Sequence, residues 1–270
     1  MSALDAWRDE LRAWALPAEV LDVAPVSPYG FDATLFRARA ERSATGPPSP
    51  TAVAALEALP QGGSVLDVGV GGGATSLPLA GRASTIVGVD GQADMLEQFA
   101  EAAKAAGVTP EMLLGSWPAI EAGAPVADLV VCGHVLYNVQ ELEPFVRALT
   151  AHARARVVIE LTDVHPWAWM GFLYERFHDL ARPAGPTAAR CEAALGELGI
   201  DVQRAAFETP FAVGFETKES AVALVRRRLC LTADRDDEIV VALGSLLAQR
   251  DGLWSAGPPT MTYSTMWWTP

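Results

Sequence analysis

A glycine-rich turn near residue 69 is the segment of this sequence whose residue types and spacing carry the clearest chemistry. Gly69, Gly71 and Gly73 follow a short apolar run, and their missing side chains allow a tight turn and the close approach of a bound group. A strand that enters this turn, with a helix expected from about Ala74, presents backbone N–H groups to a ligand. The turn therefore predicts a site for an adenosine-containing cofactor.

Two carboxylates flank this turn along the chain. Asp90 closes the next apolar run, where a carboxylate can accept both hydroxyls of a ribose. Asp67 stands two residues before Gly69 in an otherwise apolar run. The stretch from Gly69 to Ala74 also satisfies the dinucleotide pattern G-x-G-x-x-A, but Asp67 would repel a pyrophosphate and attract a sulfonium or an ammonium. The charges therefore favour a cationic cofactor over a nicotinamide dinucleotide.

Three segments together resemble the motifs of class I S-adenosylmethionine-dependent methyltransferases. They are residues 65–73, residues 86–90 and residues 127–138, the last of which resembles the segment around that family's fourth strand. The resemblance spans about residues 50–161 and implies a Rossmann-like sheet of seven strands, the last strand being antiparallel and inserted between two others. It also implies methyl transfer with S-adenosyl-L-methionine as the cofactor.

The resemblance assigns cofactor-binding roles to positions that match the motifs. The glycines would pack under the methionine and ribose part of the cofactor, and Asp90 would hold the ribose hydroxyls. Asp67 would lie near the amino end of the cofactor or order the turn. Ser116 replaces an acidic residue that commonly reaches the adenine amine in such proteins. The complete set of implied cofactor-binding residues is Asp67, Gly69, Gly71, Gly73, Asp90, Gln92, Met95, Ser116, Trp117, Gly133 and His134.

Catalytic groups follow from what methyl transfer needs, which is proximity, alignment and, for some acceptors, removal of a proton. His134 and His165 are the candidate bases, because they follow the expected fourth and fifth strands. For each of them, a packed and hydrogen-bonded histidine is the alternative. Arg37 or Arg39 can neutralise the cofactor's carboxylate or lie at the surface. The aromatic helix expected at 166–180 either lines the acceptor pocket or belongs to the core.

The elements that must position these residues show an α/β pattern, in which short apolar runs alternate with helical periodicity from Thr51 onward. We expect a Rossmann-like, seven-stranded, mostly parallel sheet with helices on both faces. Residues 1–50 would form an N-terminal helical cover over a domain at 51–270, with insertions at about 163–186 and 215–250. Expected strands are 64–69, 85–90, 111–114, 127–132, 156–161, 202–208 and 261–268, and expected helices are 3–16, 31–42, 51–58, 92–106, 140–152, 165–182, 187–199, 217–229 and 235–249, besides one from about residue 74.

The composition limits the partners. A net charge of −13 disfavours nucleic acid, the three cysteines show no metal-binding spacing, and no uncharged apolar stretch reaches the ~18 residues of a membrane span. We expect a cytoplasmic protein that binds no metal and methylates a small-molecule acceptor at oxygen, nitrogen or carbon. The alternatives are an NAD(P)-dependent oxidoreductase and a non-catalytic S-adenosylmethionine-binding protein, and the oligomeric state stays open.

Overall fold

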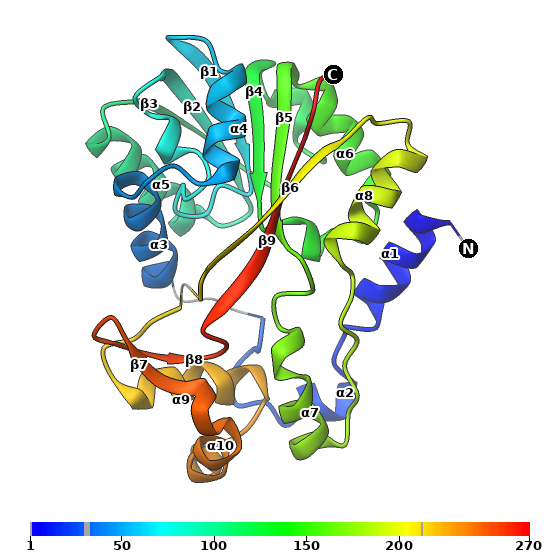
Figure 1. Ribbon diagram of the computed structural model, residues 1–270, viewed down its shortest axis with the longest axis vertical. Coiled ribbons are helices and arrows are strands. Elements are labelled where there is room, and N and C mark those ends of the chain that lie inside the picture. The colour runs from blue at the N-terminus through cyan, green and yellow to red at the C-terminus, as the bar shows by residue number, and fades with distance from the viewer. Residues whose placement is uncertain (1, 30–32, 212) are drawn as a thin grey trace.

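Seven strands form one sheet among the residues that the computed structural model describes, which are 2–29, 33–211 and 213–270, with the backbone alone at 33–38. The strands lie in the order β3-β2-β1-β4-β5-β9-β6, and β9 is antiparallel to both of its neighbours (Figure 1). The expected Rossmann-like α/β class is confirmed, including the inserted antiparallel strand. The strand bounds are β1 Gly63–Val68, β2 Ala83–Asp90, β3 Thr109–Leu114, β4 Ala127–Gly133, β5 Ala153–Thr162, β6 Gln203–Pro210 and β9 Thr260–Trp268.

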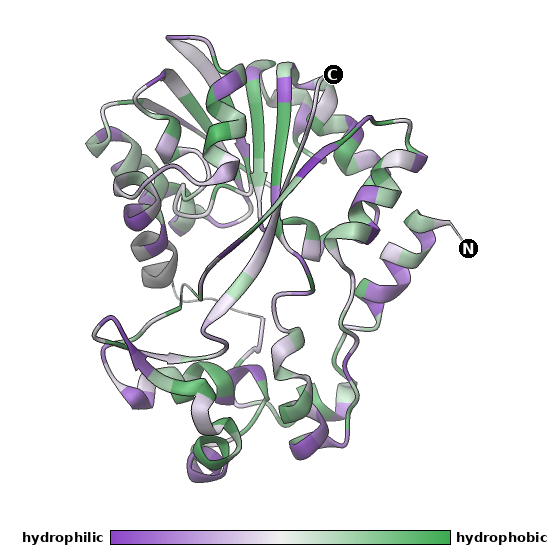
Figure 2. Ribbon diagram, in the orientation of Figure 1, coloured by the Kyte–Doolittle hydropathy of each residue, from purple (hydrophilic) through white to green (hydrophobic). Residues whose placement is uncertain are grey.

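Helices cover both faces of this sheet, so its central strands are apolar along both sides (Figure 2). Successive side chains of a strand point to opposite faces. Leu66 of β1 enters the core shared with α1, α6 and α8, whereas Val65 enters the core shared with α3, α4 and α5. The bounds of these helices are α1 Ala3–Arg12, α3 Ala33–Thr45, α4 Pro50–Ala58, α5 Ala93–Ala105, α6 Leu142–Ala151 and α8 Ala188–Glu197.

The amphipathic helix expected at 3–16 forms but ends at Arg12. Ser2 caps its first turn by accepting the backbone N–H of Asp5 at 3.0 Å. Trp7 is fully buried, and its indole N–H donates to the carbonyl of Val139 at 2.8 Å. This one side chain therefore anchors α1 to the loop after β4.

A further group of elements, which we call the helical unit, lies beyond the carboxyl ends of the parallel strands (Figure 1). It has its own apolar core, to which Leu173, Val225 and Ile239 contribute. Two strands, β7 and β8, pair as a hairpin on this core. The helical unit consists of α2 Ala18–Leu21, α7 Gly171–His178, α9 Lys218–Arg228, α10 Asp236–Leu243, β7 Leu247–Arg250 and β8 Leu253–Ala256.

The prediction of a helix from about Ala74 is wrong, because the chain there forms turns and one short 3-10 helix. Pro78 lies inside that 3-10 helix, and glycines precede and follow it, so no longer helical run is available. The other 3-10 helices are equally short. The bounds of the described 3-10 helices, with this one first, are η1 Leu77–Leu79, η2 Glu121–Gly123, η3 Leu136–Asn138, η4 Ala168–Met170, η5 Ala233–Arg235 and η6 Gly244–Leu246.

Two expected helices in the helical unit end well before the predicted residue. The helix expected at 165–182 comprises η4 and α7 and ends at His178, because the next residue, Asp179, has a left-handed φ of 51°. The helix expected at 235–249 stops at Leu243, and the β7–β8 hairpin follows. Asp251 and Gly252 turn this hairpin with φ values of 49° and 82°. An Asp-Gly pair is a recognised hairpin signal, so this element could have been found in the sequence. None of the described helices has both the length and the apolar character that a membrane span requires.

Candidate functional site

The glycine turn and Asp90 meet at the carboxyl edge of the sheet, as the sequence predicts. Gly69, Gly71 and Gly73 have φ values of 75°, 50° and 89°, which lie in the region that only glycine adopts freely. Asp90 accepts the backbone N–H of Gly71 at 2.9 Å through one oxygen and that of Gln92 at 3.0 Å through the other. The carboxylate at the end of β2 therefore fixes the turn that follows β1.

The space beside three of the glycines is filled by the protein itself. A Cβ on Gly69 would overlap the side chain of Val135, and one on Gly133 would overlap Thr75. A Cβ on Gly73 would lie 2.9 Å from Leu77. The sequence suggested that the missing side chains make room for a ligand, but at these positions they make room for the neighbouring turn.

Asp67 is a buried carboxylate in the middle of this arrangement. It is 1 % exposed, and neither of its oxygens has a hydrogen-bond partner among the described residues. Burial raises the pKa of Asp67 to about 7, the nearby Ser76 hydroxyl lowers it, and the Asp90 carboxylate raises it further. A buried carboxylate without donors is costly, so this group suits a cation or a donor supplied by a ligand.

His134 and Glu160 form a largely buried pair at the ends of β4 and β5, with side chains that are 18% and 12% exposed. His134 has a φ of 61°, and its Nε2 atom lies 2.7 Å from Oε1 of Glu160. The second oxygen of Glu160 accepts the hydroxyl of Thr51 at 2.5 Å, and this hydroxyl lies 2.6 Å from that of Thr265. Arg39 contacts Nε2 of His134 and approaches Oε1 of Glu160 at 3.4 Å. Segments α3, α4, β4, β5 and β9 therefore meet at one carboxylate.

The charges of this pair are set by its surroundings. Burial and the Arg39 guanidinium lower the pKa of His134, although Glu160 opposes them. Burial alone would raise the pKa of Glu160, but His134, Arg39 and Thr51 outweigh it and lower that pKa to about 2. At neutral pH the imidazole is therefore neutral and the carboxylate ionised. Because the ionised carboxylate can only accept, we assign the ring proton to Nε2, which donates it to Glu160, and the lone pair to Nδ1. The Arg39 guanidinium, which is also a donor, then pairs with the same carboxylate.

A row of aromatic rings leads from this pair to His165. The ring of His134 lies 5.2 Å from that of Tyr263, edge to face. The hydroxyl of Tyr137 lies 2.7 Å from that of Thr162 and accepts the Thr162 backbone N–H. The Tyr137 ring lies 5.7 Å from that of His165. These rings form a continuous row beyond the ends of β4 and β5.

His165 is packed rather than paired with an acid. Its ring stacks on Trp14 with centroids 3.6 Å apart, and its Nδ1 accepts the backbone N–H of Trp167 at 3.3 Å. Burial first, and then the cations Arg182 and Arg228, lower the pKa of His165 to about 3. This imidazole is a much weaker base than an ordinary histidine.

The remaining positions that the motifs assigned to the cofactor lie around α5 and β3. Gln92 is exposed at the start of α5, and Met95 is buried one turn later. Ser116 is exposed beside Gly91. The indole of Trp117 donates to the carbonyl of Phe145 at 3.4 Å and meets His152 edge to face. Their contacts with a cofactor stay predictions, and the side chain of Arg37 lies outside the described residues.

Sequence reasoning missed Glu160, Thr51 and Tyr263. One signal was available for the first of them, because Glu160 interrupts the apolar run Val157–Leu161 as Asp67 interrupts that of β1. The other two come from α4 and from the antiparallel strand β9, which no local pattern places next to β5.

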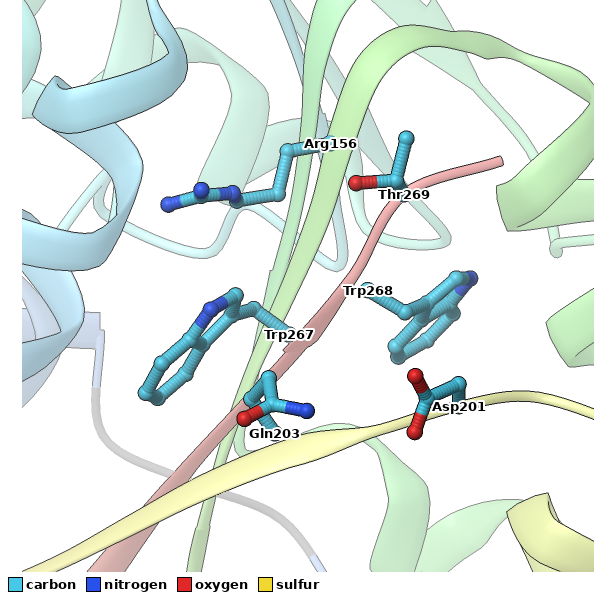
Figure 3. A pocket seen from close by; sticks show the side chains of 6 residues that line it. All are labelled: Arg156, Asp201, Gln203, Trp267, Trp268 and Thr269. Carbon is cyan, nitrogen blue, oxygen red and sulfur yellow. The ribbon is translucent and has the colours of Figure 1, made fainter.

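A hollow of about 330 Å³ lies at the opposite end of the sheet (Figure 3). It is lined by Arg156, Asp201, Gln203, Trp267, Trp268 and Thr269. The guanidinium of Arg156 already donates to the carbonyl of Ala54 at 2.6 Å and pairs with Glu57 at 3.3 Å. This hollow is separate from the residues gathered around His134, at the carboxyl edge.

Comparisons with known proteins agree with this geometry. Residues 65–156 match the model of a family described as a methyltransferase domain. The fold is similar to that of the YcgJ protein from Bacillus subtilis (TM-score 0.54, 15% identity, 81% of this chain and 97% of that chain covered). It is also similar to a putative methyltransferase from Bacillus halodurans (0.53, 14%, 81% and 96%) and to the magnesium protoporphyrin IX methyltransferase from Synechocystis, solved with bound SAH (0.50, 15%, 88% and 90%). No curated protein matches the sequence.

Proposed function

We propose that the chain is an S-adenosylmethionine-dependent methyltransferase whose acceptor is a small molecule, because residues 65–156 match the model of a methyltransferase domain within this fold. The supporting observation is the cover over Glu160, where Arg39 and Thr51 from the N-terminal segments contact the carboxylate beside His134. A covered edge suits a small acceptor better than a macromolecule. The net charge of −13 also disfavours nucleic acid.

The residues present fit the cofactor. S-adenosylmethionine supplies a methyl group on a positively charged sulfur, and it also carries an ammonium group and a ribose. The unpartnered oxygens of Asp67 suit its positive charge or its N–H donors. Asp90 has remaining acceptor capacity for ribose hydroxyls, because each oxygen takes only one backbone N–H.

We assign the base to Nδ1 of His134. This atom has no hydrogen-bond partner among the described residues, whereas Nε2 is held by Glu160. When an O–H or N–H acceptor is methylated, its proton passes to Nδ1, and the imidazolium that forms lies next to the Glu160 carboxylate. Glu160 thus orients the ring and stabilises its charged form, while Arg39 restricts how far the pKa can rise.

Calorimetric titration with S-adenosylhomocysteine tests the proposed cofactor site. We expect saturable binding that weakens by about tenfold or more in Asp90→Ala, because a ribose contact and the order of the glycine turn are both lost. Asp94→Ala, an exposed carboxylate on α5, is the matched control and should bind normally. Binding of NAD(H) in place of S-adenosylhomocysteine would contradict the proposal.

Turnover separates an enzyme from a protein that only binds the cofactor. Labelled S-adenosylmethionine incubated with small-molecule acceptor pools should give a methylated product with the wild type. His134→Gln should bind S-adenosylhomocysteine but lose most of this turnover, by about 100-fold for a general base. Equal turnover by His134→Gln would remove the base from the proposal.

A further inference from the structure

Strands β6 and β9 continue past the end of β5 and carry the chain into the helical unit (Figure 1). The last residue of β5, Thr162, pairs with Tyr263, but β6 and β9 remain paired as far as Pro210 and Thr260. The backbone N–H of Phe211 then donates to the carbonyl of Pro259 at 3.0 Å. From Tyr263, which contacts His134, to Pro259 is about 13 Å of extended chain.

Unsatisfied buried polar atoms gather at the far end of this extension. Nε1 of Trp169, Nη1 of Arg250 and Oγ of Ser255 are buried and have no hydrogen-bond partner among the described residues. The indole and the guanidinium can only donate. A buried donor without an acceptor is costly, so these groups call for an acceptor that the described chain does not supply.

Direct contacts link Trp169 to Arg250. The ring of Trp169 meets that of Phe211 edge to face at 6.1 Å. Gly257 packs against the Phe211 ring, since a Cβ at residue 257 would lie 2.5 Å from this ring. Nη2 of Arg250 donates to the carbonyl of Gly257 at 3.2 Å. The two unsatisfied donors therefore belong to one cluster around Phe211 and Gly257.

The hairpin β7–β8 directs Arg250 and Ser255 to the same side. Arg250 pairs with Leu253, and Ser255 pairs with Ala248, so these four side chains share one face of the hairpin. The opposite face carries Trp254, which packs on the core of the helical unit. Among the described residues, no carboxylate lies within ion-pair distance of Arg250, so its charge is not compensated there.

We propose that Arg250 and Trp169, with Ser255 beside them, bind a terminal oxyanion of the acceptor, either a carboxylate or a phosphate. This inference rests on the proposed function, because it treats the group methylated near His134 and the oxyanion as parts of one molecule. The length of about 13 Å from Tyr263, which contacts His134, to Pro259 then indicates an elongated acceptor, with its reactive O–H or N–H at one end and its negative charge at the other.

The two anions can be tested without knowing the acceptor. The melting temperature of the full chain is measured against sodium acetate and sodium phosphate, with sodium chloride keeping the ionic strength constant. We expect a saturable rise with at least one of the two oxyanions, and the stronger of them identifies the terminal group. No saturable rise with either would overturn the proposal.

Variants assign any such rise to the cluster. Arg250→Gln should raise the apparent Kd by about tenfold or more, and Trp169→Phe, which keeps a ring but removes the donor, should raise it to a smaller extent. Arg250→Lys keeps the charge and should retain most of the binding, whereas Arg147→Gln, on the exposed surface of α6, should not change it. An unchanged Kd in Arg250→Gln would overturn the proposal.

Binding of S-adenosylhomocysteine, measured on the same variants, separates the two proposals. Arg250→Gln should keep its affinity for S-adenosylhomocysteine, which also shows that the variant is folded. If the wild type binds the oxyanion but no S-adenosylhomocysteine, the proposed function fails and the anion site stands.

Discussion

His134 is joined to Glu160 twice, once through its side chain and once through its backbone. Nε2 lies 2.7 Å from Oε1, and the backbone N–H of His134 donates to the Glu160 carbonyl at 2.8 Å. The left-handed backbone at His134, with φ of 61°, turns the ring back over the carboxylate of the neighbouring strand. The orientation of this imidazole is therefore fixed by β5 and does not depend on a mobile loop.

Replacing Glu160 by Gln should lower the pKa of His134 further. The carboxylate raises that pKa against burial and Arg39, so its loss should lower the pKa of His134 further. NMR titration of labelled histidines measures this, with His134→Gln assigning the signal. Glu57→Gln, a surface carboxylate paired with Arg156, is the control, and equal titration curves for the two variants would refute the charge coupling.

Replacing Asp67 by Asn should stabilise the empty protein at high pH. The pKa of Asp67 is raised from 3.8 to about 7, so the folded state increasingly disfavours its ionisation as the pH rises from 3.8 to 7. Relative to Asp67→Asn, the wild type should lose about 2 to 3 kcal/mol of unfolding free energy between pH 5 and pH 8. Urea unfolding at the two pH values measures the difference.

The exposed Asp94→Asn provides the comparison for Asp67→Asn. Its unfolding free energy should follow that of the wild type at both pH values. If Asp67→Asn also follows the wild type, Asp67 is not the buried, uncompensated carboxylate described above. Asp67→Asn should in addition bind S-adenosylhomocysteine more weakly. Asp67 would then be a residue that lowers the stability of the fold but contributes to ligand binding.

Replacing His165 by Phe should make the protein more resistant to acid. The pKa of His165 is lowered from 6.5 to about 3, so the unfolded chain takes up a proton below pH 6.5 that the folded protein excludes. The wild type should lose about 1.4 kcal/mol per pH unit relative to His165→Phe over this range. Denaturation between pH 7 and pH 5 tests this, and parallel curves for the two proteins would exclude the effect.

Replacing Gly69 by Ala should destabilise the fold by about 2 to 4 kcal/mol, because the new Cβ meets both a positive φ and the side chain of Val135. Val135→Ala in the same chain should recover part of that loss. Gly62→Ala is the matched control, since Gly62 has a φ of 73° and no atom within 4 Å of its Cβ position. A loss at Gly69 no larger than at Gly62 would show that Val135 does not hold the turn.

The sequence predicted the sheet well, because strands that are buried on both faces are continuous apolar runs. The predictions of helices were wrong where turn-forming or helix-breaking residues interrupt a helical spacing of apolar residues. The expected helix after Ala74 is broken by Pro78, and the Asp251–Gly252 turn produces a hairpin where helical spacing continues. Both features are visible in the residues, but periodicity outweighed them.

The candidate site was also predicted only in part. Asp67, the glycines and Asp90 were placed together because they follow consecutive parallel strands, whose carboxyl ends meet at one edge. The residues gathered around Glu160 come from α3, α4 and β9, so their positions depend on the tertiary arrangement of the whole chain. A resemblance that ends near residue 161 says nothing about such contacts.

The contacts of Thr51 also bear on the order in which the site is assembled during synthesis. Thr51 is separated by 109 residues from Glu160 and by 214 residues from Thr265. Contacts of such long range form slowly and late, and a nascent chain can fold β1 to β5 on the ribosome well before β9 exists. Before β9 arrives, Thr51 can reach Glu160 but has no Thr265 hydroxyl beside it, so the polar contacts of the site are completed only when the sheet closes.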